Sequence, residues 1–193
     1  MFLNRVLAVS LLIASPAVLA DSLDVNLNNN AAAFKFNSSA SDFIEGNSEI
    51  YGGLAYNDKN NMFFDAGLIV KGGEEDSPGL SIGVGVKAVF GIIHPANFPN
   101  TTNTGSALAV GGQAVFALPT PTRVAVVADY YASPKIMSFA DAERFNQFGA
   151  RVEVEVSPQA NVYFGYREIG FGIKNGGSQT LDSGTHLGVL VMF

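Results

Sequence analysis

The sequence predicts an all-β protein: a closed, antiparallel, up-and-down transmembrane β-barrel of ten strands, with eight strands as the alternative. Three observations lead to this prediction. Apolar residues recur at every second position in many segments, the residues between them are mostly small or sparsely charged, and turn-forming residues separate the segments. After residue 20, no apolar run approaches the ~18 residues that indicate a membrane-spanning helix.

The composition excludes several classes of protein. Only 15% of the 193 residues are charged and 21 are glycine, whereas an average soluble domain has about 25% charged residues. Lys and Arg total 11 against 17 Asp and Glu, which argues against nucleic-acid binding. The absence of cysteine from the sequence excludes disulfides, thiolate catalysis, zinc ribbons and iron–sulfur clusters.

Residues 1–20 are predicted to be a cleaved signal peptide, and residues 21–193 to form the barrel. Arg5 precedes an apolar stretch, and Val18 and Ala20 fit the small-residue rule of signal peptidase, with Asp21 as the first mature residue. An uncleaved membrane anchor is the alternative, but the apolar stretch is short for a spanning helix of ~20 residues. The segment therefore predicts an exported protein.

The clearest alternation covers residues 80–90, where every even position is apolar and Lys87 is the one charged residue between them. A period of two residues gives a strand one apolar face and one polar face. Strands are predicted in the same way around Leu23–Leu27, Ala32–Phe36, Ile50–Tyr56, Met62–Val70, Leu108–Phe116, Val124–Tyr130, Phe148–Val156, Val162–Phe171 and Thr185–Phe193.

The polar face of the strands has few charged residues, and this indicates which face points into the barrel. A periplasmic sandwich or a lipocalin-like barrel would turn its large apolar residues inward and present a strongly charged face to water. Residues 108–116 offer no charge, and residues 80–90 offer one. Small residues suit the crowded interior of a small barrel and Val, Leu and Phe suit lipid, so an outer-membrane barrel is predicted.

Connection lengths give a second argument. Such barrels have short periplasmic turns, longer external loops and both termini in the periplasm. On this basis 157–159, 119–122 and 71–79 are assigned to the periplasm, and the connection near Ser178, 133–144, 93–105 and 57–61 to the exterior. An even strand count then requires Leu23–Leu27 to be a strand, which gives ten. A short helix is expected at Phe139–Phe145.

Three segments resemble the YfaZ family of small Gram-negative outer-membrane proteins. They are Asp129–Pro134 at a strand end, Gly165-Tyr166-Arg167, and the closing Gly188–Phe193. The resemblance extends over the mature chain and implies an outer-membrane location and a barrel architecture. It implies no activity for particular residues. The connections at 72–79 and 93–105 are longer than in the family pattern.

Charged residues on the inner parity form the candidate site. Because charges inside a small barrel cannot all stay hydrated, they are expected to pair. Two interpretations remain open, an ion-pair network that seals the lumen and a narrow polar pore. Arg151, Glu153 and Glu155 are expected to form an inward column that Arg167 reaches from the next strand. The predicted lumen network is Lys35, Asp65, Lys87, Asp129, Arg151, Glu153, Glu155 and Arg167.

No cofactor, metal site or catalytic group is predicted. A lipid-modifying enzyme would need a Ser–His pair, but Ser183 and His186 lie on opposite parities of one strand. An adhesion barrel that acts through 93–105 and 133–144 is a further alternative to a structural or porin-like role. The expected partners are outer-membrane lipid, lipopolysaccharide and, through the C-terminal Phe193, the barrel-assembly machinery. Interfacial aromatic girdles are expected from Tyr56, Phe63, Phe64, Phe90, Tyr130, Tyr131 and Phe171.

Overall fold

The computed structural model describes residues 21–72, 79–94, 102–174 and 177–193. The predicted signal peptide, residues 1–20, lies outside these ranges, as do 73–78 and 95–101 from two of the connections and residues 175–176. The fold is almost entirely β.

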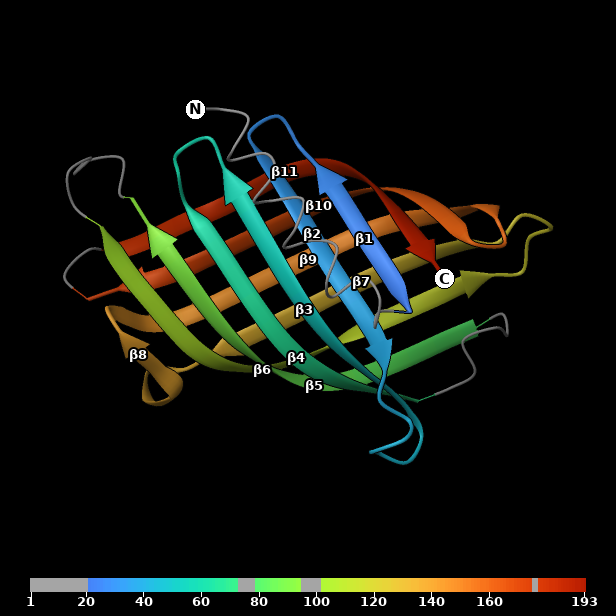
Figure 1. Ribbon diagram of the computed structural model, residues 1–193, viewed down its shortest axis with the longest axis horizontal. Helices are drawn as coiled ribbons and strands as arrows, with labels where there is room; N and C mark the ends of the chain where they lie inside the picture. The colour runs from blue at the N-terminus through green and yellow to red at the C-terminus, as the bar shows by residue number, and fades with distance from the viewer. Residues whose placement is uncertain (1–20, 73–78, 95–101, 175–176) are drawn as a thin grey trace.

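Ten antiparallel strands form a closed barrel (Figure 1). Each strand pairs with the next, β1 pairs with β11, and β5 pairs with β6, so the ring has no free edge. The predicted count of ten strands is therefore confirmed, and Ser22–Leu27 is a strand. The barrel strands are β1 (Ser22–Leu27), β2 (Ala31–Ser39), β3 (Asn47–Asn57), β4 (Met62–Gly72), β5 (Gly79–Ile93), β6 (Asn103–Leu118), β7 (Val124–Ser133), β9 (Ala142–Ser157), β10 (Ala160–Ile173) and β11 (Gly177–Met192).

The helix expected at Phe139–Phe145 is wrong. Ser138–Ala140 is a short strand, β8, which pairs with β6 beyond the end of β7, and β9 begins at Ala142. The helical piece is instead a single 3-10 turn, η1 (Lys135–Met137). The strands prevail because Phe139 is exposed and Phe145 is buried, and the register with β6 supplies backbone hydrogen bonds that an isolated helix of this length lacks. No helix in the described ranges is long and apolar enough to cross a membrane.

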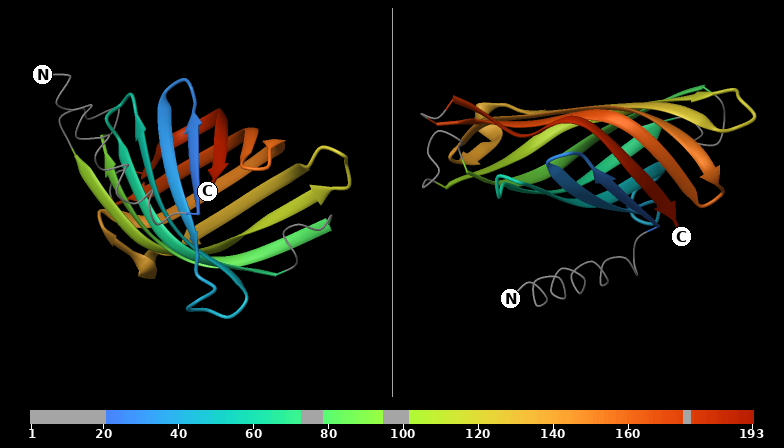
Figure 2. Two further views of the ribbon diagram at one scale, coloured as in Figure 1. Left: turned by 45° about the vertical axis from the view of Figure 1, so that its right-hand side comes forward. Right: turned by 90° about the horizontal axis from the view of Figure 1, so that it is seen from above.

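The barrel has two distinct ends. The first residue of β1 pairs with the last residue of β11, so both ends of the described part of the chain lie together. We call this the terminal end, and it also carries the turns at 119–123 and 158–159. The opposite end, the loop end, carries the connections at 28–30, 58–61 and 134–141. The strands are steeply tilted, and Figure 2 shows the barrel from two further directions.

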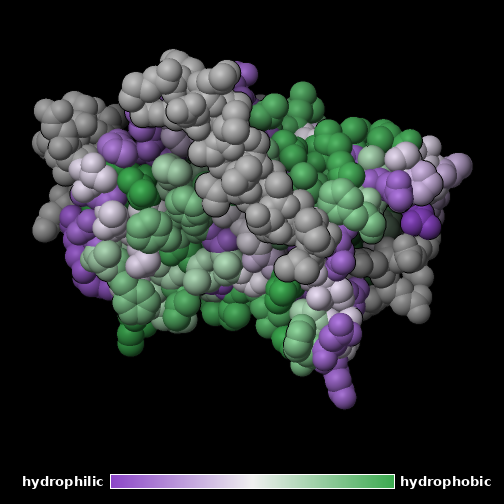
Figure 3. All heavy atoms as spheres, viewed as in Figure 1, coloured by the Kyte–Doolittle hydropathy of each residue, from purple (hydrophilic) through white to green (hydrophobic). Residues whose placement is uncertain are grey.

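The outer wall is apolar. Leu80, Ile82, Val84 and Val86 are exposed along β5, whereas the adjacent Lys87 is 3% exposed and faces inward. The predicted facing is confirmed on this strand, and the other long strands follow the same alternation. Apolar side chains spread over much of the face seen in Figure 3, and polar ones are more frequent toward the ends.

Three aromatic residues that were expected on the outer wall lie in the interior instead. Phe63, Tyr131 and Phe171 are buried in the interior, because each lies on the inward parity of its strand. The other four, Tyr56, Phe64, Phe90 and Tyr130, are exposed on the outside. The interior therefore contains aromatic packing that a search for interfacial girdles assigns to the wrong face.

Apolar side chains fill the loop end of the barrel. Phe171 is fully buried, its ring centroid lies 5.0 Å from that of Phe145, and Phe145 stacks on Phe63 at 5.9 Å. Gly91 and Gly105 make room for Phe171, because a Cβ at either would lie 2.9 or 3.0 Å from its ring. We call the cluster the loop-end core: Ala33, Ala55, Phe63, Val89, Ile93, Ala107, Ala109, Tyr131, Ala142, Phe145, Ile169, Phe171, Ile173 and Leu181.

Candidate functional site: the barrel interior

A cavity of about 1150 Å³ occupies the interior between the loop-end core and the terminal end. Its wall reaches Pro119 and Pro158 in the terminal-end turns and Met192 at the end of β11. Toward the loop end it stops at Phe63 and Ile169, and the deeper core residues do not line it. The interior thus consists of a polar chamber and an apolar closure. All eight residues of the predicted lumen network line the chamber.

Lys87 lies where the chamber meets the loop-end core. Its ammonium group is 3.0 Å from an Asp65 carboxylate oxygen and 2.6 Å from the Gln147 amide oxygen. Three aromatic rings surround the same nitrogen, with centroids at 4.6 Å for Tyr131, 5.5 Å for Phe145 and 5.8 Å for Phe63. A charge buried this deeply costs several kcal/mol unless it is paired. The carboxylate, the amide and the ring faces together stabilise the cation.

Arg151 joins two carboxylates in the terminal half of the chamber. Its Nε donates to Glu153 at 2.5 Å, and its guanidinium lies 3.8 Å from Asp24. The guanidinium also lies 4.9 Å from the centroid of the Tyr163 ring, and the Tyr163 hydroxyl donates to Asp24. Four residues from β1, β9 and β10 therefore form one cluster, in which each buried oxygen faces a donor.

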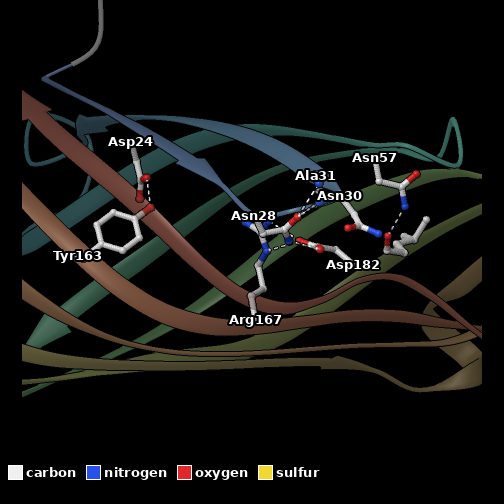
Figure 4. A network of polar contacts seen from close by, with 9 residues as sticks. Asp24, Asn28, Asn30, Ala31, Asn57, Tyr163, Arg167 and Asp182 are labelled. Atoms are coloured by element: carbon white, nitrogen blue, oxygen red, sulfur yellow. Dashed lines mark hydrogen bonds and ion pairs between the residues drawn. The ribbon is translucent and has the colours of Figure 1, made fainter.

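Arg167 does not reach this cluster, so the expected contact with the Arg151 column is wrong. In the strand register Arg167 lies opposite Gly149, while Glu153 lies opposite Tyr163, nearer the terminal end. Arg167 instead donates from Nε to Asp182 at 2.9 Å, and the Asn28 amide donates to the same carboxylate at 2.8 Å (Figure 4). This pairing connects β10 and β11 to the turn after β1.

Two further ion pairs lie near the terminal end. The Lys71 ammonium is 2.6 Å from Glu49 across β3 and β4. Glu155, the third member of the expected column, lies 3.5 Å from Arg123 in the 119–123 turn. The Arg123 side chain is 68% exposed, so we expect this pair to contribute little to stability.

Lys35 and Asp129 are placed differently from the other charges. The Lys35 ammonium lies 4.1 Å from the centroid of the Tyr51 ring. Asp129 accepts a hydrogen bond of 3.3 Å from the Gln147 amide. Among the residues that the structure describes, neither has an oppositely charged side chain within ion-pair distance. The expected lumen network is therefore divided into several separate ion-pair clusters, and two of its charged residues, Lys35 and Asp129, belong to none of them.

Sequence reasoning missed several members of these clusters. Asp24 and Asp182 each share the inward parity of their strands, so the alternation of Leu23, Val25 and Leu27 could have located Asp24. Tyr163 lies in a strand that the sequence predicts. The sequence does not show, however, whether an inward-facing aromatic residue hydrogen-bonds to a carboxylate. These residues supply partners that the predicted set lacked.

The two histidines lie apart from any cluster of potential metal ligands, since the described part of the chain contains no group of three or more such side chains. His186 faces inward and its ring meets that of Tyr163 edge-on at 5.7 Å. Ser183 faces outward, with its hydroxyl 3.0 Å from that of Tyr166. Ser183 and His186 are therefore on opposite sides of the barrel wall.

Comparisons with known proteins place the chain in a family. A solved NanC porin structure is similar over 89% of this chain and 98% of its own, at 12% identity and a TM-score of 0.45. No curated protein matches the sequence. The model of a family described as YfaZ precursor matches residues 3–193. Because this match extends over nearly all of the sequence, the chain belongs to the YfaZ precursor family.

Proposed function

We propose that this protein is a small outer-membrane β-barrel with a structural role, whose interior does not support steady passage of solutes. The observation that carries the proposal is the loop-end core. Phe145 and Phe171 are at most 1% exposed, and the core draws side chains from every barrel strand except β1. A packed apolar layer of this kind leaves no hydrated path across the barrel.

The outer wall supports the membrane part of the proposal. Only closed barrels and helices can cross hydrocarbon, because every backbone polar group must be paired. This barrel has no free edge and presents exposed Val, Leu and Phe side chains along its length. In barrels of this type both termini lie in the periplasm, so the terminal end faces the periplasm and the loop end faces lipopolysaccharide and the exterior.

Ser183 and His186 are not placed to act together as a nucleophile and its base. A serine nucleophile needs its base within hydrogen-bond reach, at roughly 2.6–3.2 Å. The outward Ser183 hydroxyl contacts Tyr166, while the inward His186 contacts Tyr163. This strand therefore offers no serine–histidine pair that could serve a lipid-modifying enzyme.

Conductance tests the proposal. The folded barrel, purified in detergent and inserted into a planar lipid bilayer, is expected to give no steady current, while a porin inserted under the same conditions conducts. Successful insertion is checked by recovering protease-protected barrel from vesicles prepared in parallel. A steady, ohmic current from single barrels would contradict the structural role and favour the narrow pore.

The C-terminal residue carries a separate prediction about assembly. Phe193 is 70% exposed and follows the alternating outward residues of β11. We propose that it is part of the signal that the barrel-assembly machinery recognises. Deleting Phe193 should reduce the amount of heat-modifiable barrel in membranes, seen on gels of unboiled samples. Deleting the exposed Phe139 side chain with Phe139→Ala is the control and should leave that amount unchanged.

A further inference from the structure

Lys35 and Asp129, the two charged residues of the predicted lumen network that belong to no ion pair within the described ranges, line the same cavity. Every other charged residue of the predicted lumen network has an oppositely charged partner: Asp65 with Lys87, Glu153 with Arg151, Glu155 with Arg123, and Arg167 with Asp182. Lys35 and Asp129 have none within the described ranges. A partly buried charge without a partner is costly, so this pair of positions requires an explanation.

Lys35 and Asp129 belong to strands on opposite sides of the barrel. Lys35 lies on β2 and Asp129 on β7, and these strands are five positions apart in either direction around the ring of ten. Both side chains are half-buried on the wall of the chamber. They therefore offer one cationic and one anionic group to the same cavity, from opposite strands of the ring.

The surroundings hold both groups in position without a direct ion pair. The Lys35 ammonium rests against the Tyr51 ring, which leaves its hydrogen-bond donors free to meet an anion. The Asp129 carboxylate lies against the backbone of β9, where a Cβ at Gly149 would collide with it. Gln147 donates one hydrogen bond to Asp129, and a carboxylate can accept several more.

We propose that the chamber binds a small zwitterionic solute, whose anionic group meets Lys35 and whose cationic group meets Asp129. A cavity of about 1150 Å³ is slightly larger than most small-molecule sites, which measure roughly 300–1,000 Å³, so it has room for a small solute. The solute enters from the terminal end, because the loop-end core closes the other side. Only this direction of entry rests on the proposed function; the binding site itself depends on the chamber alone.

Two polar side chains elsewhere on the chamber wall also have unpaired atoms. Asn26 and His186 are 6% and 7% exposed and line the chamber. The Asn26 Oδ1 and His186 Nδ1 atoms have no hydrogen-bond partner among the described residues. Buried polar atoms are normally paired, so these two side chains make this part of the chamber wall more polar than its packing requires.

Calorimetric titration of the parent barrel in detergent tests the proposal with defined probes. The probes are ω-amino acids of increasing length, from glycine through γ-aminobutyrate to ε-aminocaproate and longer, each compared with the carboxylate and the amine of the same length. At least one ω-amino acid is expected to bind about tenfold or more tighter than both of its singly charged analogues. Equal affinities throughout the series, or no binding by any member, would overturn the proposal.

Variants show which charged group of the probe contacts Lys35 and which contacts Asp129. Lys35→Met should bind the best ω-amino acid no better than the matching amine, and Asp129→Asn no better than the matching carboxylate. Lys71→Met and Glu155→Gln remove one charge each from the same wall and should keep the parent's preference. Heat-modifiable migration shows that each variant has folded, and the probe comparison on the parent decides the question if a variant does not. Titration in detergent is independent of conductance, so failure of the structural role and failure of this site are distinguishable.

Discussion

Replacing Arg151 with alanine is expected to lower the free energy of unfolding by about 3–5 kcal/mol. The change removes the cation that faces both Glu153 and Asp24. The carboxylate side chains of these partners are only 10% and 5% exposed, so neither can recover full hydration. Tyr163 still donates to Asp24 but carries no charge. Reversible urea unfolding in lipid vesicles measures the loss.

Arg123→Ala is the matched control for this prediction. It also removes an arginine from a carboxylate, Glu155, but the Arg123 side chain is 68% exposed. Exposed pairs contribute about 0–1 kcal/mol, so the control should unfold nearly as the parent does. If Arg151→Ala costs no more than Arg123→Ala, the chamber charges are hydrated as in an open pore and their pairing does not stabilise the barrel.

Phe171→Ala is expected to cost about 3–5 kcal/mol, the typical loss for a phenylalanine removed from a packed core. Phe171 is fully buried, contacts Phe145, and fills the space that Gly91 and Gly105 leave open. The neighbouring backbone belongs to a closed sheet and cannot collapse into the gap. The same unfolding assay measures the effect.

Phe164→Ala serves as the control on the same strand. Phe164 is 56% exposed on the outer wall of β10, where lipid can occupy the space that its ring leaves. The loss should be clearly smaller than for Phe171→Ala. Equal losses for the two variants would show that the loop-end core is not packed as described.

Alternation predicted most of the barrel because the period of a strand is read directly from neighbouring residues. The strand Ser22–Leu27, the facing of β5 and the ring of ten strands follow from it. The pattern failed where the backbone departs from regular pairing. At Leu181 a bulge in β11 opposite Ile169 and Gly170 shifts the register, so Leu181 and Asp182 are both buried. A sequence pattern of period two has no signal for such a shift.

The site was predictable in its members but not in its contacts. Inward parity identifies Lys35, Asp129 and Arg167 as lumen residues, but which carboxylate each one meets depends on register across neighbouring strands. Arg167 therefore pairs with Asp182 and not with the Arg151 column. The division of the interior into an apolar core and a polar chamber depends on contacts among nearly all the strands, which no single segment reveals.

The interior is open to the terminal end and closed at the loop end. Because the sequence has no cysteine, single cysteines report on access without background. Gln113→Cys places a thiol on the chamber wall and Ala109→Cys places one in the loop-end core. Thr120→Cys in a terminal-end turn and Lys135→Cys at the loop end are the reference positions for the two sides of an oriented vesicle.

The most direct measurement is the rate at which a membrane-impermeant thiol reagent labels Gln113→Cys from each side. Gln113→Cys is expected to be labelled rapidly from the side that labels Thr120→Cys and not from the side that labels Lys135→Cys. Ala109→Cys is expected to be labelled slowly from both sides. Labelling of Gln113→Cys from the loop side, at a rate comparable with that of Lys135→Cys, would show a continuous aqueous path and contradict closure of the barrel at the loop end.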